Sequence, residues 1–77
     1  MTGSVIGLSD IKKGSYEGHD YSNRYVHVMY IDDLDPIDGM KAACVKVKSD
    51  TFDRLKLKTG MDVNLGYDRF GHLAIYG

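Results

Sequence analysis

The last third of the chain carries the pattern that most constrains the fold. Apolar and polar residues alternate in residues 45–48 (Val-Lys-Val-Lys) and again in residues 62–67 (Asp-Val-Asn-Leu-Gly-Tyr). A period of two places every second side chain on the same face of a strand, so each segment predicts a strand with one buried face. Residues 58–60 and 68–71 contain the glycines that tight turns use. Residues 72–76 then predict a strand that returns alongside 62–67 as a hairpin.

Residues 24–31 (Arg-Tyr-Val-His-Val-Met-Tyr-Ile) give the strongest strand signal, because they are rich in β-branched and aromatic residues. Apolar side chains occur at both parities, which predicts a central strand covered on both sides or facing a ligand. Residues 4–8 and 41–48 predict two further strands. The polar stretch 9–23 predicts two strand ends joined by a flexible loop. Residues 32–39, with the only proline, predict another loop.

Residues 49–55 predict a short helix before the hairpin. Ser49 or Asp50 is the expected N-cap, and Phe52 and Leu55 lie three residues apart on one helix face. About five strands and one short helix in 77 residues predict a single all-β domain. We therefore expect residues 1–77 to form a small five-stranded OB-like barrel with one short helix.

Composition narrows the classes of function. The only cysteine, Cys44, is expected to be a small semi-buried residue, and a chain without a disulfide fits a cytoplasmic location. No apolar run is long enough to span a membrane, and the N-terminus does not resemble a signal peptide. The spacing of His, Cys and Asp residues fits neither a zinc site nor a calcium loop. We expect no metal, no cofactor and no enzymatic activity. A small core without a disulfide or a structural metal also predicts a homodimer. The expected dimer interface is formed either by Val26, Val28 and Tyr30 or by the face of the last strand.

Charge and aromatic residues are distributed unevenly. The formal net charge is −1, yet four of the eleven acidic residues lie in the segment 32–38, so a local basic face can form elsewhere. Six of the eight aromatic residues are tyrosines, which suit surfaces that stack against bases. Phe70 at an expected turn tip is unusual, because such tips are normally polar. The residues that we expect to bind nucleic acid are Tyr16, Tyr21, Arg24, Lys46, Lys48, Arg69 and Phe70.

Residues 18–22 (Gly-His-Asp-Tyr-Ser), the strands at 25–31 and 42–48, and the final segment 67–75 resemble the filamentous-phage single-stranded DNA-binding proteins. That resemblance implies an OB-like barrel that forms a two-fold dimer and binds single-stranded DNA with little sequence preference. It also implies aromatic contacts to DNA from a loop carrying Gly-x-x-Tyr-Ser and from a hairpin carrying Phe-Gly, which match Tyr21 and Phe70 here. The chain departs from this family in its slight negative charge and in its more helical segment 49–55.

The C-terminal half alone also resembles a swapped-hairpin AbrB-type DNA-binding domain. This resemblance rests on residues 45–47 (Val-Lys-Val), 52–65 (Phe-Asp-Arg-Leu-Lys-Leu-Lys-Thr-Gly-Met-Asp-Val-Asn-Leu) and 71–75 (Gly-His-Leu-Ala-Ile). It implies a regulator that binds double-stranded DNA and leaves residues 1–40 without a role. Three functions therefore stay open: a single-stranded nucleic-acid binder of a phage or mobile element, a protein-interaction module that uses the tyrosine-rich surface, and an AbrB-like regulator.

Overall fold

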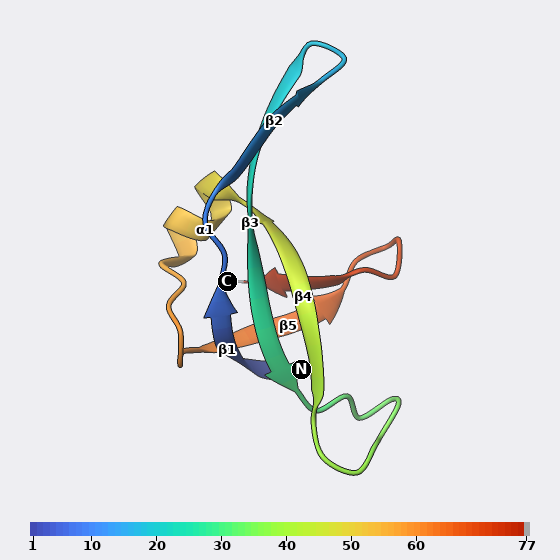
Figure 1. The fold of residues 1–77 in the computed structure, drawn as a ribbon. Helices are drawn as coiled ribbons and strands as arrows, with labels where there is room; N and C mark the ends of the chain where they lie inside the picture. Colours follow the sequence, from blue (N-terminus) through green and yellow to red (C-terminus); the bar gives the residue numbers. More distant parts are fainter. Residues whose placement is uncertain (77) are drawn as a thin grey trace.

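The structure is a computed structural model that describes residues 1–76 as one curled antiparallel sheet with a single short helix (Figure 1). The elements, in chain order, are β1 (Thr2–Leu8), β2 (Lys12–Tyr16), β3 (His19–Tyr30), β4 (Lys41–Lys48), α1 (Ser49–Leu55), β5 (Asp62–Tyr67) and β6 (Leu73–Tyr76). The expected β-rich fold with one short helix is confirmed. The sheet has six strands, one more than expected.

β3 is the central strand of the sheet. It pairs with β4 on one side, from Asn23 opposite Lys48 to Tyr30 opposite Lys41. On the other side, its first part pairs with β2 and its second part with β1, so β1 and β2 lie end to end along the same edge. β1 also pairs with β5, and β5 with β6. β4 and β6 lie next to each other, but among the described residues no backbone ladder joins them, so the sheet is not closed into a barrel.

The hairpin of β2 and β3 extends well beyond the body of the sheet (Figure 1). Glu17 and Gly18 join the two strands, and both have positive φ, which is the arrangement of a type I′ turn. The strand that we expected to begin at Arg24 therefore begins at His19. The prediction of a flexible loop within residues 9–23 is wrong. A two-residue turn instead holds β2 and β3 in register, from Lys12 opposite Asn23 to Tyr16 opposite His19.

The core lies on the concave side of the curled sheet. Val26, Val28 and Tyr30 of β3 are 0%, 0% and 7% exposed and pack with the inward residues of the other strands. These three side chains were expected to offer a dimer surface, and that expectation is wrong because the sheet curls around them. The remaining buried apolar residues are Val5, Val45, Val47, Phe52, Leu57, Val63 and Leu65.

The helix α1 covers one end of this core. Phe52 is buried and Leu55 packs against the core, as their spacing predicted. The capping prediction is wrong: Lys48 is the N-cap residue and provides no side-chain hydrogen bond. The Ser49 hydroxyl is instead 2.7 Å from the Ser22 hydroxyl, which ties the start of the helix to β3. Within residues 1–76 no helix is long and apolar enough to cross a membrane.

Candidate nucleic-acid interface

The outward face of β2, β3 and β4 gathers tyrosines and lysines. Directly opposed residues of antiparallel strands point to the same face of the sheet, so the pairing register defines this face. Lys12, Asn23 and Lys48 form one row across the three strands, and Tyr25 lies opposite Lys46 in the next row. We call this surface the aromatic–basic strip; its members are Lys12, Tyr16, Tyr21, Tyr25, Lys46 and Lys48.

The charge on the strip is entirely positive. The outward positions of β2, β3 and β4 between Lys12 and Lys48 carry three lysines and, within the described pairing, no carboxylate. Asp20 lies opposite Ser15 and therefore faces the other side of the hairpin. A protein with a net charge of −1 thus presents one face on which phosphate groups meet only positive or neutral side chains.

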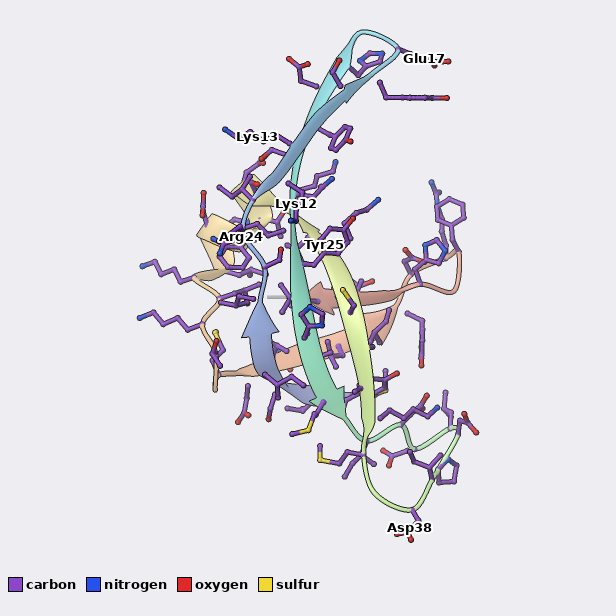
Figure 2. The ribbon with its side chains drawn as sticks, in the orientation of Figure 1. Lys12, Lys13, Glu17, Arg24, Tyr25 and Asp38 are labelled. Carbon is purple, nitrogen blue, oxygen red and sulfur yellow. The ribbon has the colours of Figure 1, made fainter. Side chains whose placement is uncertain are left out.

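Tyr21 is held flat against its own hairpin. It lies opposite Gly14, and a Cβ atom at position 14 would overlap the tyrosine ring. The ring therefore covers the glycine with one side, and the side chain remains 49% exposed. Tyr16, near the hairpin tip, is 71% exposed, whereas Tyr25 is half-buried. Figure 2 shows Tyr25 and Lys12 on this part of the sheet, with Arg24 directed away toward α1.

An open groove of about 810 Å³ runs beside Tyr21, where β4 has ended and α1 begins. Asn23 and Lys48 of the Lys12 row line it, together with Lys13 on the other face of β2. Asp20 and Asp50 line it as well, so two carboxylates offset the two ammonium groups and the groove is not part of the basic surface.

Arg24 is the expected binding residue that the structure places elsewhere. It has the inward parity of β3, and its guanidinium carbon lies 3.9 Å from the centre of the Phe52 ring. Its Nε donates a hydrogen bond to the carbonyl oxygen of Ser9 at 3.1 Å. Both contacts fix the helix and the β1–β2 connection to β3, so Arg24 belongs to the packing of the domain.

Arg69 and Phe70 form a separate exposed site at the tip of the β5–β6 hairpin. The backbone N–H groups of Phe70 and His72 both donate to Oδ1 of Asp68 at 2.9 Å, and Gly71 has positive φ. This built turn leaves Phe70 70% exposed, with the Arg69 guanidinium 4.9 Å from its ring centre. The hairpin projects past β4 on the side away from α1 (Figure 1).

Two members of the strip, Lys12 and Tyr25, were not among the expected residues. Tyr21 and Tyr25 are four residues apart, so they share a face when one strand contains both. The predicted strand began at Arg24 and therefore left out Tyr21. Cys44 also lies on this face, opposite His27, and is exposed where a semi-buried residue was expected. Among residues 1–76, no group of three or more His, Cys, Asp or Glu side chains could hold a metal ion.

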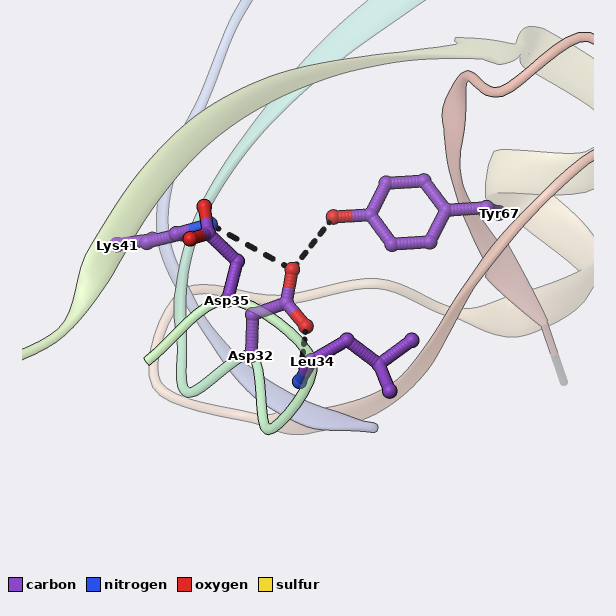
Figure 3. Close-up of polar contacts among 5 residues, drawn as sticks. All are labelled: Asp32, Leu34, Asp35, Lys41 and Tyr67. Carbon is purple, nitrogen blue, oxygen red and sulfur yellow. Dashed lines mark hydrogen bonds and ion pairs between the residues drawn. The ribbon is translucent and has the colours of Figure 1, made fainter. Parts of the chain in front are cut away.

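A second polar cluster lies at the far end of the sheet, around Asp32 (Figure 3). This carboxylate is 6% exposed and accepts hydrogen bonds from the Tyr67 hydroxyl at 2.9 Å and from the Leu34 N–H at 3.0 Å. Nζ of Lys41 lies 3.5 Å from Asp32 and 2.6 Å from Asp35. The hydroxyl of Tyr67, above all, lowers the pKa of Asp32, and the same hydrogen bond raises the pKa of Tyr67 to about 12.

This cluster holds the base of the segment that joins β3 to β4. The hydrogen bond that Lys41 donates to Asp35 is the main cause that raises the pKa of the Lys41 ammonium group. The ionised carboxylates and the ammonium group are thus mutually stabilised at neutral pH. None of these side chains lines the groove beside Tyr21, and their contacts are with one another and with Leu34, so we assign the cluster to positioning of the segment.

Comparison of the chain with protein-family models, with curated proteins and with solved structures finds no match.

Proposed function

We propose that the protein binds single-stranded nucleic acid, with little sequence preference, on the aromatic–basic strip. The observation that carries this proposal is the Tyr21 ring, which lies flat on Gly14 with an exposed side and with lysines of the neighbouring rows close by. Stacking of a base on an aromatic ring contributes ~1–3 kcal/mol and tolerates any base, because every base has a π-face. The lysines supply contacts to phosphate.

The topology supports a related proposal about the fold. We propose that β1, β3, β4, β5 and β6 correspond to the five strands of an OB-like barrel and that β2 is an added strand that lengthens β3. The helix lies between the third and fourth of these five strands, and β1 pairs with β5. OB-like domains commonly bind oligonucleotides across the face of their central strands, where the strip lies.

The strip favours single strands over a duplex, because stacking needs unpaired bases. Residues 1–40, which the AbrB resemblance leaves without a role, supply β1, β2 and all of β3. They also supply four of the six members of the strip, including Tyr21. For these reasons we propose the single-stranded function rather than the AbrB-like alternative.

Fluorescence anisotropy tests the proposed function. Labelled oligothymidine, a duplex of equal length and single-stranded RNA are titrated with the protein at low and at high salt. We expect the single strands to bind more tightly than the duplex, and we expect the affinity to fall as salt rises because phosphate contacts release counterions. Absence of binding to every probe at low salt would contradict the proposal.

A further inference from the structure

Two of the three histidines lie on the same outward face as the aromatic–basic strip. The pairing register places His19 opposite Tyr16 near the tip of the β2–β3 hairpin. It places His27 opposite Cys44, in the row that follows Tyr25. Both histidines are exposed. The strip therefore has a histidine at each of its two ends.

The charge of a histidine, unlike that of a lysine, depends on pH near neutrality. An imidazole gains a positive charge as the pH falls from about 7 toward 5, and in that form both ring nitrogens donate hydrogen bonds. A protonated histidine can therefore pair with a phosphate group as a lysine does. The strip carries three lysines, so two protonated histidines would raise the number of positive charges on this face from three to five.

The strands on both sides of His27 lack acidic residues. β1 and β4, which pair with this part of β3, contain no aspartate or glutamate. The titratable side chains that flank His27 on β4 are Cys44, directly opposite, and Lys46, one row closer to the hairpin. Asp62 lies two strands away on β5, where its carboxylate accepts a hydrogen bond from the Ser4 hydroxyl at 3.1 Å. A positive charge on His27 would therefore be available to a ligand on this face.

His19 lies near the hairpin tip with one carboxylate close to it in the chain. It faces Tyr16 across the hairpin, and Glu17 of the turn follows Tyr16 directly. Asp20 has the opposite parity and points to the other face of the hairpin. On its other side, β4 does not extend to this part of β3. Since the Glu17 carboxylate can offset part of a charge on His19, we expect the larger contribution from His27.

We propose that His19 and His27 are further phosphate-binding residues of the strip, so that the protein binds single-stranded nucleic acid more tightly as the pH falls from about 7.5 to about 5.5. This inference rests on the proposed function, because the two histidines matter only if phosphate groups lie on the strip. It adds a dependence on pH to that function and names the two residues that cause it.

Anisotropy titrations with labelled oligothymidine at about pH 7.5 and about pH 5.5 test the inference. Thymine gains no proton in this range, so a change in affinity comes from the protein. We expect the parent to bind about threefold or more tightly at the lower pH, the size of effect that an exposed charge pair produces. The slope of log affinity against log salt should steepen by ~0.7 for each histidine that contacts a phosphate.

Substitution by glutamine, which keeps a polar side chain without the charge, assigns the effect to residues. His27→Gln should remove most of the pH dependence, and the double variant with His19→Gln should remove all of it. Both variants should bind like the parent at the higher pH, where the imidazoles are neutral. The pKa of Asp32 is lowered from 3.8, so the cluster around it stays ionised at the lower pH, and thermal melting at both pH values establishes that each variant is folded.

His72→Gln is the matched control. This histidine is also exposed, but it lies on the β5–β6 hairpin, where its Nδ1 is 3.9 Å from a carboxylate oxygen of Asp68. A charge on His72 is therefore offset locally, and the variant should keep the full pH dependence.

Failure of this inference differs from failure of the proposed function. Absence of binding at both pH values and low salt would contradict the proposed function, and this inference with it. Three results would overturn the inference alone: a parent that binds equally tightly at both pH values, a pH dependence that survives in the double variant, and a pH dependence that is lost in His72→Gln.

Discussion

At the scale of single residues, Tyr21 is the side chain on which the proposed function depends most. Its ring is supported by Gly14 beneath it and needs no rearrangement before a base stacks on it. If position 14 carried a Cβ atom, the Tyr21 ring would have to tilt away from the hairpin. Gly14 therefore matters for the space it leaves as well as for its own backbone.

We expect Tyr21→Ala to weaken binding of oligothymidine by ~1–3 kcal/mol, the usual contribution of one stacked base. Tyr21→Phe, which keeps the ring and removes the hydroxyl, should bind nearly like the parent. Anisotropy titrations of the three proteins under one salt condition check this. Equal loss in both variants would show that the hydroxyl, and not the ring, makes the contact.

Tyr67 provides a prediction about pH. Its hydrogen bond to Asp32 raises its pKa from 10.0 to about 12, so the folded state favours the neutral hydroxyl. Since the folded pKa lies above the unfolded one, the contribution of this group to stability is complete below pH 10 and is lost as the pH rises from 10 toward 12. Ultraviolet titration should show one tyrosine ionising later than the others.

Asp32→Asn should return that late tyrosine toward an ordinary pKa, because the negative charge that opposes its ionisation is gone. The pKa of Asp32 itself is lowered by the Tyr67 hydroxyl, so its contribution to stability is present above its ordinary value of 3.8 and disappears as the pH falls through the folded value. Six tyrosines that titrate together in the parent would contradict the Asp32–Tyr67 contact.

At the scale of elements, the β2–β3 hairpin determines the site. Lys12 and Lys13 are neighbours in β2, both exposed, and the alternation of the strand directs them to opposite faces. Only Lys12 belongs to the aromatic–basic strip. Comparing the effects of substituting Lys12 and Lys13 therefore shows on which face of the hairpin the nucleic acid binds.

We expect Lys12→Ala to weaken binding of oligothymidine and to reduce the salt dependence of the affinity by about one counterion, as the loss of one phosphate contact does. Lys13→Ala should have the smaller effect on both quantities. Anisotropy at several salt concentrations measures them. A larger effect of Lys13 would place the nucleic acid on the other face of the hairpin.

The β5–β6 hairpin carries a separate prediction. Phe70 is 70% exposed on a turn held by Asp68, so Phe70→Ala should leave the melting temperature nearly unchanged. If Phe70 stacks on a base, the same variant should bind single strands more weakly by ~1–3 kcal/mol. Melting and binding measured on one preparation separate the two effects. A variant with parent-like affinity would restrict the interface to the strip.

The sequence predicted those elements whose periodicity is uninterrupted. The strands at 45–48, 62–67 and 73–76 and the helix at 49–55 follow from alternation and from the spacing of Phe52 and Leu55. The β2–β3 hairpin did not, because Glu17 rarely adopts positive φ and a glutamate–glycine pair gives a weak turn signal. Because this turn was missed, the predicted strand began at Arg24, whereas β3 begins at His19.

The candidate site inherited this error. Tyr21 and Tyr25 share a face only on a continuous strand, so Tyr25 was missed, and Arg24 was included although its parity turns it inward onto Phe52. Lys46 and Lys48 lie on the outward face of β4, as their alternation with the buried Val45 and Val47 predicted. The burial of Val26, Val28 and Tyr30 could not be predicted from their strand alone, since it depends on the curl of the whole sheet.

At the scale of the whole molecule, charge is divided between distant surfaces. The aromatic–basic strip lies on the outward face of β2, β3 and β4, while the carboxylates of residues 32–38 gather at the far end of the sheet. The net charge of −1 is therefore the sum of a positive surface and a negative one. This division keeps the carboxylates of residues 32–38 away from the strip.

An NMR titration of isotope-labelled protein with oligothymidine tests the central claim most directly, because a domain of 8.6 kDa gives resolved amide signals. We predict that the amide signals of Tyr21, Tyr25, Lys46 and Lys48 shift or broaden in proportion to the added oligonucleotide. The amide signals of residues 31–40, at the far end of the sheet, should stay in place. Shifts confined to other surfaces, with the strip unchanged at saturation, would contradict the account.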